Sequence, residues 1–188
     1  MEASEIISSI FSHPFVLLLL GALIGRLYFL DELIADKTIA YKIEIIRKLV
    51  DIKNTILEIE FFHDRIVNTF SKINESNGLI ATDKGVIFDE IMKVSNIVNE
   101  KLPLKKKYFD TEMNFYFKGD NCVITAYEKY SHELKSFSDF MVHQFPTEKD
   151  LFKKRLADYD IFKNSLYESE SQLIDAIKRS KHLFKAMS

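Results

Sequence analysis

The chain has 188 residues, and its 26 basic and 28 acidic residues leave a net charge of -2, which excludes a strongly basic nucleic-acid coat. Only 5 glycines and 3 prolines are present, too few for the many turns of a β-sandwich or barrel. The 1 cysteine excludes an internal disulfide framework and any multi-cysteine metal site, and it fits a reducing compartment.

The N-terminal segment, residues 1–30, is apolar and carries only three charges, Glu2, Glu5 and Arg26. Residues 6–25 hold no charged side chain, and about 20 such residues suffice for a helix to cross a hydrocarbon core of roughly 30 Å. We expect a membrane helix here. A buried or self-associating helix is the alternative, and a cleaved signal peptide is disfavoured by the acidic start and the missing small-residue cleavage motif.

Two patterns lie within this segment. Gly21 and Gly25 form a G-x-x-x-G motif, whose small residues let two membrane helices pack closely. Earlier, one helix face carries four polar side chains, which are Glu5, Ser8, Ser9 and Ser12. This polar stripe indicates either an amphipathic segment lying among lipid headgroups or the wall of a water-filled lumen in an oligomer.

Basic residues follow the apolar segment but do not precede it. Arg26, Lys37, Lys42, Arg47 and Lys48 all lie on its C-terminal side. Because basic residues stay in the cytoplasm, we expect a single pass with the N-terminus outside and the C-terminal body in the cytoplasm.

Residues 31–74 contain neither proline nor glycine and predict one long helix. Its main heptad seam, in steps of four and three, comprises Ile45, Leu49, Ile52, Ile56, Ile59, His63, Ile66, Phe70 and Ile73. A second apolar row, which we expect to widen the buried face, comprises Ile39, Ile43, Ile46, Val50 and Leu57.

Three further helices are expected. The second helix begins near Thr82 and ends before Pro103, and residues 102–119 have a mixed pattern. The third begins after Asp120, a suitable N-cap, and the fourth follows Thr147 and runs toward Ala186. The fold class is therefore all-α, with residues 31–188 forming an antiparallel helical bundle.

The search for catalytic chemistry finds no phosphate-binding glycine loop and no zinc-protease motif, so no cofactor, metal or small-molecule substrate is expected. His63 lies in the heptad seam and is interpreted as a core histidine. Cys122 is interpreted as a small buried hydrophobe. The lysine run 105–107 and the basic run 153–155 are interpreted as solvated.

Arg179 and His182 share a face of the last helix, as do the arginine and histidine of HEPN ribonucleases, although those have a longer spacing. With this degenerate pair, the apolar head and the small helical body, the chain resembles in layout the membrane accessory proteins of type VI-B CRISPR loci. The resemblance implies a divergent HEPN-like body and an oligomeric pore in the bacterial inner membrane. An RNA-guided CRISPR effector would trigger this pore to depolarise the cell in antiphage defence.

Three hypotheses follow for function. The first is an oligomeric membrane pore, in contact with lipid and with other copies of the chain. The second is a membrane-anchored adaptor whose helical body docks a cytoplasmic partner, for example along the heptad seam. The third is a tethered ribonuclease that uses Arg179 and His182, but the altered spacing argues against an enzyme.

Overall fold

The computed structural model describes residues 14–75, 81–143 and 149–180, and within these ranges it does not describe the side chains of residues 14–20, 31, 34, 73–75, 81–84 and 149. The chain divides into two compact units, Met1–Ile43 and Glu44–Ser188. All regular structure in the described residues is helical, which confirms the expected all-α class.

The first described helix, α2, spans Pro14–Glu75 and belongs to both units. Its length follows from the absence of proline after its first residue, since a proline is tolerated in a first turn but interrupts a helix interior. The expectation of one helix over 31–74 is confirmed, and the helix also includes the preceding apolar residues from Pro14 on.

The next helical run was expected to end before Pro103, and that expectation is wrong. Helix α3, Ala81–Asn96, passes into a π-helix, η1, Ile97–Lys101, and then into α4, Leu102–Tyr116. The N–H of Leu102 bonds the carbonyl of Ile97, five residues back, which widens the turn. Pro103 then occupies the first turn of α4, where its missing N–H does least harm.

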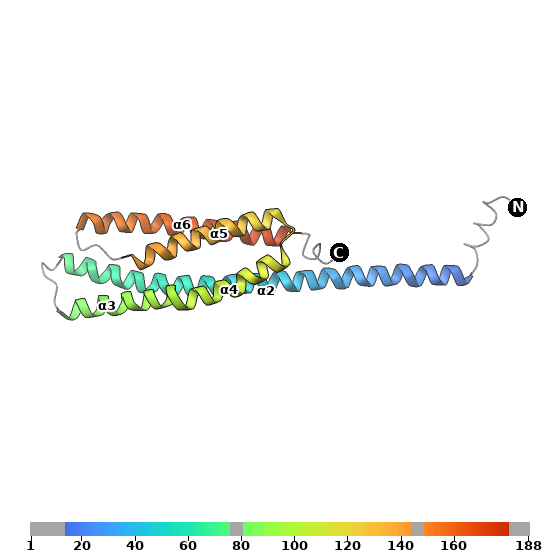
Figure 1. The fold of residues 1–188 in the computed structure, drawn as a ribbon, viewed down its shortest axis with the longest axis horizontal. Helices are drawn as coiled ribbons and strands as arrows, with labels where there is room; N and C mark the ends of the chain where they lie inside the picture. Colours follow the sequence, from blue (N-terminus) through green and yellow to red (C-terminus); the bar gives the residue numbers. More distant parts are fainter. Residues whose placement is uncertain (1–13, 76–80, 144–148, 181–188) are drawn as a thin grey trace. The chain divides into compact units, whose positions relative to one another are not determined.

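The last two helices begin where the sequence predicted, and the expected end of the fourth near Ala186 lies outside the described residues. Helix α5 spans Asn121–Val142, and Asp120 is its N-cap because its carboxylate accepts the N–H groups of Cys122 and Val123. Helix α6 spans Lys149–Arg179. In Figure 1 the direction of the chain reverses from α2 to the continuous α3–η1–α4 run, then to α5 and again to α6, and α5 and α6 lie side by side. This is the expected antiparallel bundle.

The core of the second unit is built on the main heptad seam of α2. The members from Ile45 to Ile66 are almost fully buried, and the seam packs with aromatic and aliphatic side chains of the other helices, among them Phe109, Tyr130 and Leu173. The seam is therefore covered by the chain itself and is not available to dock a partner.

The second apolar row of α2 does not widen the buried face, contrary to expectation. Ile39, Ile43, Val50 and Leu57 are exposed, and only Ile46 packs against the core. Val50 and Leu57 lie more than a third of a turn away from the seam, so a helix whose seam faces the bundle centre directs them away from the core.

Among the described residues, no helix is both long enough and apolar enough to cross a membrane. Of the charge-free stretch 6–25, only residues 21–25 have described side chains.

Candidate functional site

The apolar segment of α2 in the first unit is uncovered along its described length. Every residue from 21 to 30 is exposed, including Leu23 at 60%, Leu27 at 55% and Phe29 at 64%. Because successive residues point in all directions around a helix, this apolar surface is continuous around the axis. Such a surface marks contact with lipid or with other protein.

The two glycines of the predicted packing motif lie on this uncovered stretch. A Cβ atom added at Gly21 or Gly25 would meet nothing within 4 Å. Among the described residues of one copy nothing packs on this face, so the space that a second helix would need is open.

Most residues predicted to line a lumen or to form a catalytic pair fall outside the described structure. Glu5, Ser8, Ser9 and Ser12 lie outside the described residues, as does His182. Arg179 is described; it is the last residue of α6 and is exposed. The lumen and the Arg179–His182 pair therefore remain predictions.

The second unit contains a buried polar cluster between α2 and α6. The Glu60 carboxylate accepts the hydroxyl of Tyr167 at 2.8 Å and pairs with the Lys163 ammonium at 3.0 Å. One turn away, the His63 ring stacks on Tyr159, with 3.9 Å between ring centroids. These contacts hold the two helices together through polar groups as well as through the apolar seam.

His63 is almost fully buried, as its place in the seam predicted. Burial lowers the pKa of its imidazole from 6.5 to about 4, and the positive charge of Arg155 acts in the same direction, while nearby Asp64 opposes both. The burial of the ring and its stacking on Tyr159 confirm the interpretation of His63 as a core histidine.

Each of the two basic runs contains a side chain that is less solvated than expected, while Lys107, Lys153 and Lys154 are exposed. In the first run, which lies in α4, Lys105 donates to the Asp51 carbonyl oxygen of α2 at 3.0 Å, and Lys106 pairs with Asp110 of its own helix at 2.5 Å. In the second run, Arg155 is buried and donates to the Phe140 carbonyl oxygen at 3.0 Å. Conversely, Cys122 is exposed, which corrects its interpretation as a buried hydrophobe.

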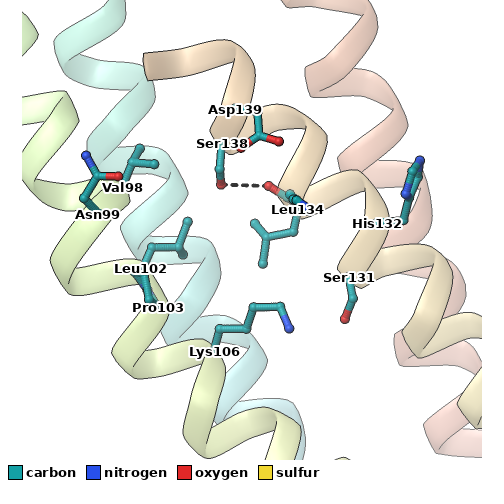
Figure 2. Close-up of a pocket in the computed structure, with 11 residues that line it drawn as sticks. Val98, Asn99, Leu102, Pro103, Lys106, Ser131, His132, Leu134, Ser138 and Asp139 are labelled. Carbon is teal, nitrogen blue, oxygen red and sulfur yellow. Dashed lines mark hydrogen bonds between the residues drawn. The ribbon is translucent and has the colours of Figure 1, made fainter. Parts of the chain in front are cut away.

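A cavity of about 550 Å³ lies between η1 with the start of α4 on one side and α5 on the other. Figure 2 shows Leu102 and Leu134 directed into it, with Lys106 extending across from α4 toward Ser131 of α5. The Ser138 hydroxyl donates a hydrogen bond to the Leu134 carbonyl oxygen at 2.7 Å. The cavity thus offers an apolar floor with hydroxyl, amide and ammonium groups around it.

The sequence analysis did not find this cavity, although one signal was available. Pro103 removes a backbone N–H in the middle of a helical run, and the turn before it widens into the π-helix that supplies Val98 and Asn99 to the wall. Within the described residues, no cluster of three or more metal-ligating side chains accompanies it. Leu102 and Leu134 give the cavity an apolar floor that can accept an apolar group.

Comparison of the chain with protein-family models, with curated proteins and with solved structures gives no match.

Proposed function

We propose that this chain is an oligomeric membrane protein whose N-terminal helices insert into the bilayer and assemble an ion-conducting pore, with the helical bundle in the cytoplasm. The observation that supports this proposal is the apolar stretch 21–30 of α2, whose side chains are exposed all around the helix. Burying apolar surface gains about 25 cal/mol per Å². Insertion into lipid, or packing with other copies, would bury the apolar side chains on every side of the helix and so gain this free energy.

The charge-free stretch extends the described apolar surface toward the N-terminus, since residues 6–25 contain no Asp, Glu, Lys or Arg. The basic residues follow the stretch, which favours a cytoplasmic bundle. Arg26, near the end of the stretch, is long enough to extend its guanidinium to the headgroups.

The pore itself follows from the polar stripe of Glu5, Ser8, Ser9 and Ser12. A polar stripe at membrane depth needs protein or water beside it, and one helix cannot enclose water. Several copies in a closed ring would direct the stripes inward, and the ring of Glu5 carboxylates would favour cations. The uncovered Gly21 and Gly25 provide a close-packing face between neighbouring helices.

The biological setting comes from the layout resemblance to the accessory proteins of type VI-B CRISPR loci. On that resemblance, the membrane is a bacterial inner membrane, and an RNA-guided effector is the partner that opens the pore during phage infection. Depolarisation of the infected cell is the expected consequence.

The experiment measures ion flux from liposomes that carry the full-length chain, with flotation of the liposomes as a separate test of insertion. Replacing Ser8, Ser9 and Ser12 together with leucine should preserve flotation and abolish flux, whereas Glu5→Lys should reduce the preference for cations.

The matched control replaces three serines of the bundle that are not fully buried, with the changes Ser71→Leu, Ser165→Leu and Ser171→Leu. This variant adds the same three leucines outside the stripe and should retain flux if the bundle still folds. Liposomes that remain tight to small ions with the wild-type chain, in the presence and absence of the effector, would overturn the pore.

The second candidate function is the membrane-anchored adaptor, and the cavity between η1–α4 and α5 favours it. An apolar floor bordered by polar groups is the kind of surface that accepts a side chain of a partner. If Asn99→Trp, at an exposed residue of the cavity wall, abolishes effector binding and the wild-type chain gives no flux, the chain is an adaptor and its N-terminal helix is only an anchor.

A further inference from the structure

The outward face of α2 within the second unit carries large apolar side chains that the chain leaves uncovered. Val50, Leu57 and Phe61 are 41%, 45% and 57% exposed, and Asn54 between them is exposed as well. The steps between these positions are four, three and four residues, so they form one line along the helix, opposite the buried seam. This is the spacing of a second helix–helix contact.

The two ends of this line carry opposite charges. Arg47 precedes Val50 by one helical step and Asp64 follows Phe61 by one step, and their side chains are 69% and 67% exposed. We call the line Arg47, Val50, Asn54, Leu57, Phe61 and Asp64 the outer seam.

We propose that a second copy of this chain docks on the outer seam in the antiparallel direction, seam against seam. A two-fold axis perpendicular to α2 then places Val50 opposite Phe61 of the second copy, and Asn54 opposite its Leu57. The same axis places Arg47 opposite Asp64 of the second copy at both ends of the contact. The ends of the outer seam are thus complementary to each other in charge.

The charge pattern selects the antiparallel direction. In a parallel pair, Arg47 would oppose Arg47 and Asp64 would oppose Asp64, and both contacts are repulsive. In the antiparallel pair, Asp51 and Glu58 beside the seam approach each other, but each has a lysine of α4 or η1 next to it. Lys101 pairs with Glu58, and Lys105 bonds the Asp51 carbonyl at 3.0 Å.

The size of the contact predicts its strength. The apolar part, residues 50–61, is about 18 Å long at 1.5 Å per residue, and each copy contributes three large apolar side chains. This is a small interface, so we expect association in the micromolar range that weakens as salt is added. Copies inserted side by side in one membrane carry α2 in the same direction, so this antiparallel contact joins copies of different assemblies and goes beyond the membrane role proposed above.

Cysteine cross-linking between two differently tagged copies tests the pairing. Both copies are full length, kept in mild detergent, and carry Cys122→Ser to remove the exposed native thiol. One copy carries Val50→Cys and the other carries Phe61→Cys. The antiparallel pair predicts that the mixed cross-link exceeds either self cross-link by about tenfold, because a disulfide forms only between nearby Cα atoms.

Phe88→Cys and Ile161→Cys are the matched controls, since both native side chains are 63% exposed but lie away from the outer seam. They should give no cross-link above background. Predominant self cross-links of Val50→Cys would mean a parallel pair, and an absence of all cross-links would mean that no second copy binds here; either result overturns the proposal.

A charge exchange provides the independent measurement. Arg47→Asp alone should weaken dimerisation by about tenfold, because two attractive pairs become repulsive. Analytical sedimentation measures the dimerisation constant. Adding Asp64→Arg to the same chain should restore the wild-type affinity. If the wild-type chain gives the cross-link but no flux, the pore is wrong and the interface stands. If it gives flux but no cross-link, the interface is wrong and the pore stands.

Discussion

The imidazole ring of His63 on α2 stacks on the phenol ring of Tyr159 on α6, with 3.9 Å between the centroids and 18° between the planes. The contact lies beside the Glu60–Tyr167 hydrogen bond, so α2 and α6 are linked by an aromatic stack and by a polar network next to it. Because the stacked imidazole is buried and neutral, it connects the stability of the bundle to pH.

The stability of the bundle should fall as the pH drops from 6.5 to about 4. In this window the unfolded chain binds a proton at His63 and the folded chain does not, because burial lowers the pKa of the folded imidazole to about 4. The unfolding free energy therefore rises with pH through the window, by on the order of 3 kcal/mol from this group. Urea unfolding at several pH values measures it.

His63→Phe supplies the comparison for that pH dependence, since it keeps a ring against Tyr159 and removes the titration. At pH 7.5, where the imidazole is neutral in the folded and the unfolded chain, the difference in unfolding free energy between wild type and variant reflects only packing. Between pH 6.5 and 4 the variant should lose less stability than the wild type. Equal losses in the two proteins would show that the buried imidazole does not titrate as described.

Glu60→Ala should destabilise the bundle by about 2 kcal/mol, because it leaves the Tyr167 hydroxyl and the Lys163 ammonium without their shared acceptor. In a double-mutant cycle with Tyr167→Phe, we expect a coupling of about 1 kcal/mol. Glu168→Ala, at an exposed carboxylate of α6, is the control and should change stability by less than about 0.5 kcal/mol. Additive effects of Glu60→Ala and Tyr167→Phe would contradict the network.

The sequence predicted the buried seam of α2 because a helical period repeats over many turns, and Ile45 through Ile66 are buried as expected. It could not assign the second row, since periodicity identifies two apolar faces on one helix without showing which one the rest of the chain covers. Val50 and Leu57 were for that reason placed inside, although they are exposed.

The cavity and the polar cluster depend on contacts between residues far apart in the chain. Glu60 meets Tyr167, and Leu102 faces Leu134, only after the helices pack. A single sequence gives the helix on which each residue lies but not the rotation of one helix against another. Pro103 was interpreted as a stop, because the widened π-turn that accommodates it has no distinctive sequence pattern.

Asp120→Ala should destabilise the bundle by about 2 kcal/mol. The Asp120 carboxylate accepts two N–H groups of the first turn of α5, and its other oxygen accepts the Ser180 hydroxyl at 2.5 Å. An N-cap alone is worth about 1 kcal/mol, so the rest comes from the link to the residue after α6. Asp120→Asn should retain most of the cap. Thermal unfolding of Asp120→Ala, Asp120→Asn and Ser180→Ala separates the contribution of the N-cap from that of the Asp120–Ser180 hydrogen bond. Melting temperatures equal to that of the wild type in all three variants would contradict both contributions.

Arg155→Lys should destabilise the bundle by about 1–2 kcal/mol, although both side chains are basic. The Arg155 guanidinium lies 4.4 Å from the centroid of the Phe140 ring while donating to the Phe140 carbonyl oxygen at 3.0 Å. A planar guanidinium can stack and donate at once, whereas an ammonium must remain hydrated or lose its water on burial. Lys154→Arg is the matched control, because Lys154 is exposed one residue away and should tolerate the exchange within about 0.5 kcal/mol. Chemical denaturation compares the two variants. If Arg155→Lys is as stable as Lys154→Arg, then the buried guanidinium contributes charge only, and the α5–α6 contact does not depend on its shape.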